Sequence, residues 1–464
     1  MDWEKLLSAK RLGAEDISLR RRPGRTEFES DIDRIVFSSA FRRLGRKTQV
    51  HPLAANDHVH TRLTHSLEVS RVGRALGKEL GYRLRASPDN YSPKLPPSVT
   101  PDDLGTIVQA ACLAHDVGNP PFGHAGEEAI IHWFDQNRDK LPAYIQEDLK
   151  HDLSSLEGNA QGFRIVTQLE NHVFTGGLRL TYATLGAFQK YPWTSRKGEK
   201  KFGAYITEAA ILDKIFGELG LEKRGDNAWC RHPLAHLVEA ADDICYAIID
   251  IEDAVELGIL RFEEAKDVLL ALFTNEERLT IEQTLVPPKM HRVNFARMRG
   301  QVFDKTISGA IEAYLGAYGR IMTGNYDGAL FDLLAAKDPR RTIIARAKKL
   351  GRESIYTDTR KVEIEIGCYS TFDTLLVEFC EAAHNQAQIL NDPSNESKLK
   401  WKSGRVLRLL GDHAPSRDNA PPGGWTPYQC FRRVIDFVSG MTDNYAVYIA
   451  RQLQGAAFSG VQRP

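Results

Sequence analysis

The sequence lacks any apolar stretch that could cross a membrane or direct secretion. No run of about 18 apolar residues, the length a transmembrane helix needs, occurs among its 464 residues. Residues 1–13 are charged and contain no apolar core of the kind found in a signal peptide. We therefore expect a cytoplasmic protein without a membrane partner.

Cysteine is scarce, and its spacing excludes two common uses. None of the six cysteines stands in a C-x-x-C pair, and several lie in apolar helical stretches, where a free cysteine behaves as a small hydrophobe. They are Cys112, Cys230, Cys245, Cys368, Cys380 and Cys430. We expect no disulfide framework, and the pattern fits a reducing compartment.

Net charge is also absent, because 61 Lys and Arg residues balance 61 Asp and Glu residues. A neutral chain has no overall attraction to nucleic acid or to an acidic membrane surface. One basic run, formed by Arg20, Arg21, Arg22 and Arg25, is interpreted as a solvated loop in preference to a phosphate-binding surface. The motif G-x-x-x-x-G-K-[ST] is missing, which excludes P-loop chemistry.

The sequence does contain strong helical periodicity. Apolar residues recur at i, i+3, i+4 and i+7 within residues 63–80, 104–112, 234–248 and 307–318. Residues 361–367 alternate, which predicts either a short strand or the start of a helix. Polar segments at 87–101, 193–202, 391–400 and 411–424 predict loops too short for a domain linker. We predict an all-α fold, a single large domain with peripheral helical additions.

Four ionisable residues lie in apolar helical surroundings. His65 lies near the start of the first predicted helix, His115 and Asp116 end the second, and Asp242 lies inside the third. Each alone is a weak signal, since a lone histidine is more often an ordinary core or surface residue. An uncompensated buried charge is costly, so a metal ion or another charge should lie beside the His-Asp pair. Imidazole and carboxylate groups are common ligands of divalent ions.

A polar stripe follows the third predicted helix. Asp242, Tyr246 and Asp250 are spaced i, i+4 and i+8, so their side chains share one face, and apolar residues flank them. This pattern favours a buried helix with one face lining a cavity, and a structural hydrogen-bond network is the alternative.

Residues 117–127 are rich in glycine and proline and predict an ordered loop in place of a helix. His124 and Glu127 would face the same cleft if this loop folds back. A histidine beside a carboxylate suits proton transfer, whereas a histidine that only caps a turn is equally compatible with the segment.

Together these residues follow the pattern H…HD…D, and the chain resembles the HD phosphohydrolases. Other segments narrow the resemblance to the dGTPase family. The matching blocks are 33–35, 40–44, 47–50, 60–69, 118–127, 157–162, 190–192, 231–234 and 239–246, with a further one at 439–443. Asn119 stands where animal relatives carry histidine, so their substrate choice does not carry over.

The resemblance implies a role for each candidate residue. One divalent ion, manganese or magnesium with iron or cobalt as alternatives, would be held by His65, His115, Asp116 and Asp242. Proton transfer would fall to His124 and Glu127. The substrate would be contacted at its phosphates by Arg62, Lys190 and Tyr191, and at its deoxyribose by Gln49, Tyr246 and Asp250.

The implied activity is metal-dependent hydrolysis of dGTP and other dNTPs to a deoxynucleoside and inorganic triphosphate. The alternatives are another HD phosphohydrolase, such as a 5′-nucleotidase or phosphodiesterase, and a regulator that senses nucleotides or single-stranded DNA. The family also implies a homo-oligomer, hexameric or dimer-based, with a dNTP or single-stranded DNA effector. We expect a nucleotide-contacting helical segment at 1–60, an HD core at 61–255, and a helical region at 256–464 that completes the site and the oligomer contacts.

Overall fold

The computed structural model describes residues 1–15, 24–51, 56–140, 145, 147–171, 175–392, 394, 400–421 and 423–456. Its long elements are all helices, and within these ranges extended segments meet only in isolated bridges. The all-α prediction is confirmed. The basic residues Arg20, Arg21 and Arg22 lie outside the described residues, whereas Arg25 forms an ion pair with Asp33.

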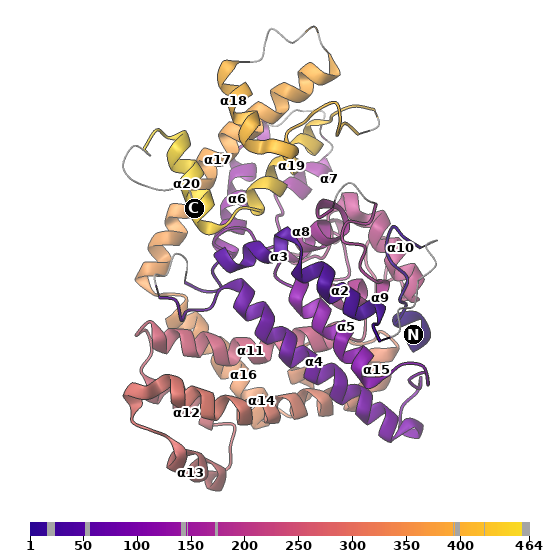
Figure 1. Cartoon of the computed structure of the whole chain (residues 1–464), viewed down its shortest axis with the longest axis vertical. Helices are drawn as coiled ribbons and strands as arrows, with labels where there is room; N and C mark the ends of the chain where they lie inside the picture. The colour runs from indigo at the N-terminus through magenta and orange to yellow at the C-terminus, as the bar shows by residue number, and fades with distance from the viewer. Residues whose placement is uncertain are drawn as a thin grey trace.

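One set of helices packs around the largest apolar cluster, in the lower part of Figure 1. Its central members are α4 (Arg62–Ala86), α5 (Pro101–Ala114) and α11 (Ala235–Glu256), which pack against one another. The surrounding helices are α1 (Trp3–Leu6), α2 (Glu27–Val36), α3 (Ser39–Arg43), α8 (Gly158–Arg164), α9 (Tyr182–Phe188), α10 (Ala209–Leu219), α12 (Phe262–Leu270), α13 (Asn275–Thr284), α14 (His291–Gly316), α15 (Tyr318–Met322) and α16 (Pro339–Leu350).

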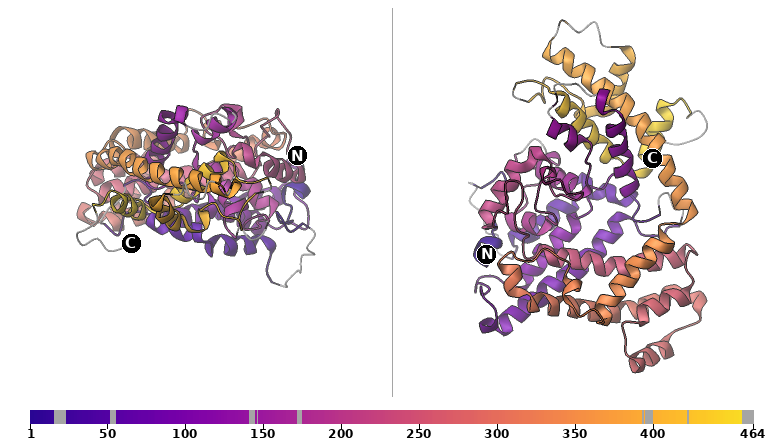
Figure 2. Two further views of the ribbon diagram at one scale, coloured as in Figure 1. Left: turned by 90° about the horizontal axis from the view of Figure 1, so that it is seen from above. Right: turned by 180° about the vertical axis from the view of Figure 1, so that it is seen from behind.

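A second apolar cluster holds the upper part of the molecule together (Figure 1). The long helix α17 (Thr359–Asn391) packs there against one earlier helix and three later ones. They are α6 (His124–Gln136), α18 (Trp401–Leu410), α19 (Pro427–Ser439) and α20 (Asp443–Leu453), with α7 (Glu147–Leu153) against α19. The view from behind shows α17 running from this upper group down to the lower one (Figure 2).

Local signals explain where the central helices begin. Thr61 and Thr100 cap α4 and α5 through reciprocal hydrogen bonds with the third residue of each helix, and Pro101 occupies the first turn of α5. The expected apolar faces are mostly buried, although Leu67 of α4 is exposed and Tyr318 starts the separate helix α15.

Residues 361–367 lie within α17, so the helical alternative is correct and the strand is not. The reason lies downstream, where Cys368, Phe372, Leu375 and Phe379 recur at helical spacing and are all buried. This buried face stabilises a helix, and the alternating residues 361–367 form the first turns of that same helix.

All six cysteines are free and buried, in agreement with the expectation of no disulfides. No helix in the described ranges is both long and apolar enough to cross a lipid bilayer.

Candidate functional site

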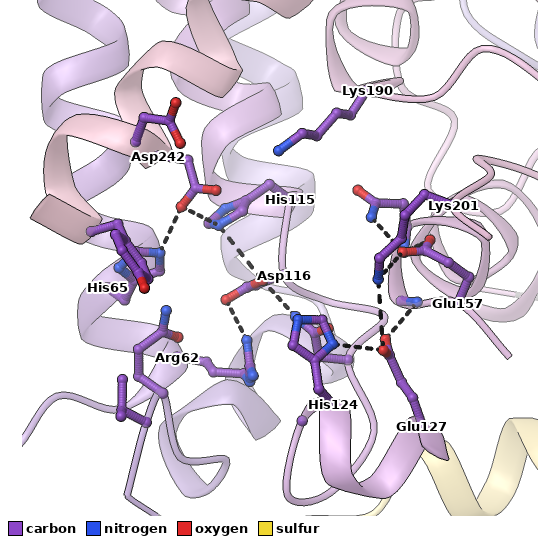
Figure 3. A pocket seen from close by; sticks show the side chains of 18 of the residues that line it. Arg62, His65, His115, Asp116, His124, Glu127, Glu157, Lys190, Lys201 and Asp242 are labelled. Atoms are coloured by element: carbon purple, nitrogen blue, oxygen red, sulfur yellow. Dashed lines mark hydrogen bonds and ion pairs between the residues drawn. The ribbon is translucent and has the colours of Figure 1, made fainter. Parts of the chain in front are cut away.

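The four candidate metal ligands converge from three helices. His65 lies in the first turn of α4, His115 directly follows the last residue of α5, and Asp242 lies in the middle of α11. Asp242 Oδ1 lies 3.1 Å from His65 Nε2 and 3.7 Å from His115 Nε2. Asp116 Oδ1 lies 3.6 Å from His115 Nε2. Figure 3 shows these side chains pointing toward one another.

The donor set and its spacing suit one divalent ion. Ligand atoms of His65, His115 and Asp116 lie within 4.8 Å of one another. Two ligands at about 2.1 Å from one ion are at most about 4.2 Å apart, and each of the three N–O distances above is shorter. His115 Nδ1 lies 2.6 Å from the Cys112 carbonyl oxygen and donates to it, so that Nε2 is the ring nitrogen that faces the cluster.

The electrostatics of the cluster also favour a cation. Burial raises the pKa of Asp116, but Arg62, His115 and His65 outweigh it and lower that pKa to about 2. Burial likewise opposes ionisation of Asp242, yet the hydrogen bond from His65 and the charge of His115 bring its pKa well below the usual range. Both carboxylates are therefore charged near neutral pH. His65 Nδ1 is buried without a hydrogen-bond partner.

A close approach of two backbones fixes the end of α5. A Cβ atom at Gly118 would lie 2.1 Å from the carbonyl oxygen of Gly158, at the start of α8. Only glycine lets these two segments touch, and the contact places α8 directly beside the His-Asp turn.

His124 and Glu127 form a hydrogen-bonded pair at 2.7 Å on the opposite side of the pocket. Their placement corrects one expectation, because both lie in the first turn of α6 and not in a loop. Gly123, at a φ of 59°, ends the loop and lets the helix begin at His124. The His124 side chain is 78% exposed, whereas that of Glu127 is only 7% exposed. The histidine can therefore reach a bound molecule while its partner stays fixed.

Two further groups hold the Glu127 carboxylate. Its Oε1 accepts from the Gly158 amide at 2.9 Å, and Lys201 Nζ lies 3.9 Å from Oε2. The same lysine pairs with the buried Glu157 at 3.1 Å. Burial raises the pKa of Glu127, but the hydrogen bond and charge of His124, with the charge of Lys201, lower it overall.

The polar stripe of α11 lines the same cavity. Asp242, Tyr246 and Asp250 all contribute to its wall. Tyr356 donates to Asp250 Oδ2 at 2.9 Å and also hydrogen-bonds the Tyr246 hydroxyl. Burial raises the pKa of Asp250 to about 7, and its Oδ1 atom has no hydrogen-bond partner. A buried acceptor is thus available to a donor from a bound molecule.

Positive side chains surround the remaining wall. Arg62 Nη1 donates to Asp116 Oδ2 at 2.8 Å, and Lys190 Nζ lies 3.4 Å from Glu239 Oε1. Burial opposes the charge of Lys190, but Glu239 and Asp242 raise its pKa overall, so it carries a full positive charge. In Figure 3 its amine extends toward the metal cluster.

The structure brings all twelve sequence-predicted site residues to one cavity of about 620 Å³. The same wall contains residues that sequence reasoning did not single out, namely Glu157, Lys201, Lys348, Arg352, Tyr356 and Lys361. Glu157 stands within a segment already noted as distinctive. The others lie in a polar loop, in α16 and α17, or between these helices, where nothing in the local pattern separates them from surface residues.

The fold and this site define an HD-domain protein, and residues 62–167 match the family model described as HD domain. The chain is 45% identical over 466 residues to a deoxyguanosinetriphosphate triphosphohydrolase-like protein of Pseudomonas aeruginosa, covering 98% of this chain and 99% of the relative. A protein of the same description from Synechocystis sp. is 35% identical, with 98% and 99% covered. A deoxyguanosinetriphosphate triphosphohydrolase of Enterobacter sp. is 30% identical, with 90% and 92% covered. The chain belongs to the deoxyguanosinetriphosphate triphosphohydrolase-like family.

Proposed function

We propose that the protein hydrolyses deoxynucleoside triphosphates, dGTP among them, to a deoxynucleoside and inorganic triphosphate. The observation that carries this proposal is the convergence of His65, His115, Asp116 and Asp242 in a cavity whose wall also carries an exposed histidine. The wall also carries positive side chains suited to phosphates and the α11 residues Tyr246 and Asp250, which are suited to a sugar.

A divalent ion, manganese or magnesium with iron or cobalt as alternatives, would be held by these four residues. When bound, it would polarise an oxygen of the α-phosphate and activate a water molecule. The ionised carboxylates, and the Nδ1 bond to Cys112 that turns His115 Nε2 toward them, support this assignment.

The protein's own groups supply the rest of the proposed reaction. Arg62 and Lys190 offset the negative charge of the phosphates, and Tyr191 lies beside them in the cavity wall. As water adds to the α-phosphorus and the bond to the 5′ oxygen breaks, His124 donates a proton to that oxygen. Glu127 orients the imidazole and stabilises its charged form.

The sugar end is assigned to Gln49, Tyr246 and Asp250. Gln49 Oε1 and Asp250 Oδ1 are both buried acceptors without a partner, and both residues line the cavity. A 3′-hydroxyl could donate to either atom, and Tyr246 would pack under the deoxyribose where a 2′-hydroxyl would clash. An unpaired buried acceptor rejects an analogue that cannot satisfy it.

Three further expectations extend the proposal to the whole molecule. We propose that residues 1–60, 61–255 and 256–464 act as the nucleotide-contacting segment, the HD core and the region completing the site. We also propose a cytoplasmic homo-oligomer, hexameric or dimer-based, with a dNTP or single-stranded DNA effector. Light scattering on the purified protein, with and without mixed dNTPs or an oligonucleotide, measures the oligomeric state and shows whether an effector changes it.

The activity is tested with all four dNTPs, alone and mixed, in the presence of manganese or magnesium, with chromatographic identification of products. Release of triphosphate and deoxynucleoside supports the proposal. Release of orthophosphate or pyrophosphate contradicts it and indicates another HD phosphohydrolase. Tight single-stranded DNA binding at physiological salt by metal-free protein, without hydrolysis, would instead indicate a nucleic-acid sensor.

A further inference from the structure

Two buried ionisable side chains tie residues 439–443 to the segments just before Gln49 and His124, the proposed substrate-contacting and proton-donating residues. Lys47 and Asp443 are each only 2% exposed. Neither residue has a role in the proposed reaction, although each stands in a segment that resembles the family. The inference below rests on the proposed function of Gln49 and His124.

Asp443 begins α20 and uses both carboxylate oxygens on distant segments. Its Oδ2 accepts from the Thr48 amide at 2.9 Å and from the Thr48 hydroxyl at 2.7 Å. Its Oδ1 accepts from the Phe122 amide at 3.0 Å. Thr48 directly precedes Gln49, and Phe122 stands two residues before His124. One carboxylate therefore touches the loop on each side of the pocket.

Lys47 makes the complementary contacts. Its Nζ donates to the carbonyl oxygens of Asn119 at 2.6 Å and of Ser439 at 2.7 Å. Its own carbonyl accepts from the Arg62 amide at 3.0 Å. The lysine thus joins the same three segments as Asp443, namely 47–48, 119–122 and 439–443.

We call the contacts of Asp443 and Lys47 with these three segments the clamp. The backbone of Phe122 shows which turn the clamp holds. Phe122 has a φ of 62°, a left-handed conformation that a bulky residue adopts only when its surroundings impose it. The Phe122 N–H donates a hydrogen bond to Asp443 Oδ1, and the Phe122 ring packs on Phe372 at 6.2 Å between centroids, so both contacts help to hold this conformation. Gly123 and the start of α6 follow directly, so the position of His124 depends on this turn.

We propose that Asp443, supported by Lys47, is a positioning residue for the active site, which sets the Phe122–Gly123 turn and so places His124 opposite the substrate. The same carboxylate holds Thr48 and so places Gln49. Neither Asp443 nor Lys47 needs to contact substrate or metal. The region near the C-terminal end of the described chain is therefore part of the catalytic geometry.

The test compares Asp443→Asn with Asp152→Asn. Asp152 is a matched control, because it is also a fully buried carboxylate that joins α19 to a second segment, through Tyr428 and Ser195, away from the pocket. An asparagine keeps the volume but presents one acceptor oxygen in place of two, so it cannot serve both Thr48 and Phe122.

Backbone hydrogen exchange of the full-length protein is the first measurement, and it needs no activity. Asp443→Asn should speed exchange in the peptides that cover 47–50 and 118–126. Asp152→Asn should leave exchange in both peptides unchanged. Thr48→Val removes only the hydrogen bond from the Thr48 hydroxyl to Asp443 and should speed exchange in the 47–50 peptide alone. It replaces Asp443→Asn in the test if that variant does not fold. Unchanged exchange at 118–126 in Asp443→Asn, or an equal rise in the control, overturns the proposal.

The second measurement separates positioning from general destabilisation. If His124 is displaced, kcat on a dNTP should fall about tenfold to a hundredfold, because proton donation to the leaving group is worth about 10²–10⁴ in rate. Hydrolysis of a p-nitrophenyl phosphodiester, whose leaving group needs no proton, should change less than about threefold on the same reasoning. Equal losses on both substrates overturn the positioning role. If the wild-type protein does not hydrolyse dNTPs, the proposed function is refuted. The hydrogen-exchange result alone then tests whether Asp443 holds the two segments.

Discussion

At the scale of single residues, the site separates the proposed metal ligands from the proposed proton-transfer pair. His124 lies on α6, away from the cluster of His65, His115, Asp116 and Asp242, and its partner is Glu127. This separation is what allows each function to be removed alone.

Replacing His124 with alanine should lower kcat on dNTPs by about 10²–10⁴, because a general acid contributes about that much. The metal content of the purified protein, measured by mass spectrometry, should stay unchanged. Asp242→Ala is the contrasting variant and should lose the metal together with activity. Loss of metal in His124→Ala would reassign this histidine as a ligand.

A second prediction concerns the ionisation of Asp250. Burial raises its pKa from 3.8 to about 7, so in the metal-free protein it keeps a proton that the unfolded chain has lost. Between about pH 4 and pH 7 the folded state therefore binds more protons, and this group lowers the free energy of unfolding as pH rises, by at most about 1.4 kcal/mol per unit. Urea unfolding at several pH values should show a flatter dependence for Asp250→Asn. If the free energy of unfolding of the two proteins changes with pH in the same way, the raised pKa of Asp250 is contradicted.

Sequence reasoning found the residues with unusual surroundings and missed those with ordinary ones. A His-Asp pair after an apolar run, or a polar stripe on an apolar helix, is conspicuous without a structure. Tyr356 and Arg352 lie on a helical segment of mixed composition, and only the fold shows that this segment reaches α11. Such residues become recognisable once long-range contacts are known.

At the scale of elements, the site depends on how closely α5 and α8 approach. Gly118 after α5 and Gly158 at the start of α8 are in backbone contact, and Glu127 accepts a hydrogen bond from the Gly158 amide. A shift of α8 would therefore disturb both the turn that carries His115 and Asp116 and the His124–Glu127 pair.

Gly118→Ala should force these segments apart and lower the free energy of unfolding by about 1–3 kcal/mol, as overpacking does in other cores. The affinity for manganese should fall as well, which calorimetric titration measures. Gly217→Ala is the matched control, since Gly217 lies within α10 with no atom within 4 Å of an added Cβ. That variant should be neutral or more stable by up to about 1 kcal/mol. Equal behaviour of the two variants would exclude the proposed contact.

The elements also show where periodicity fails as a guide. Glycine and proline at 118–123 correctly predicted a loop, but α6 starts at His124 because a single positive-φ glycine suffices to end that loop. Residues 361–367 look like a strand in isolation, and the buried face of α17 decides the matter. In both cases the deciding residues lie outside the short segment under consideration.

At the scale of the whole molecule, the pocket lies where two apolar cores meet. Phe122 belongs to the upper core of α6 and α17–α20, whereas α4, α5 and α11 belong to the lower one. A ligand held by both parts should stabilise their association.

Metal removal tests a narrower expectation, the stability of the lower part, because the proposed ligands all come from α4, the end of α5 and α11. An ion at about 100 times its Kd adds about 2.7 kcal/mol to the free energy of unfolding of a protein that binds it only when folded. For a chain of this size that corresponds to a fall in Tm of a few degrees on chelation. Calorimetry with and without chelator should show this fall in wild-type protein and not in His115→Ala. An unchanged Tm in the wild type would argue against a structural contribution from the metal.

The long-range organisation was the part least accessible from sequence. Helical periodicity predicted the all-α class, because each helix carries its own pattern. Nothing in either segment shows that Asp443 bonds Thr48, since a carboxylate at the start of a helix usually serves that helix alone. Pairing across such a distance is a property of the folded chain.

The contact between Asp443 and Phe122 joins residues 321 positions apart. During synthesis at about 5–20 residues per second, roughly 15–60 s pass between the emergence of these two residues from the ribosome. If Asp443 acts as proposed, α4, α5 and α11 can pack together in that interval, whereas the turn before His124 still lacks the carboxylate that holds it. A nascent chain would thus contain the four proposed metal ligands well before the proposed proton donor is held in place.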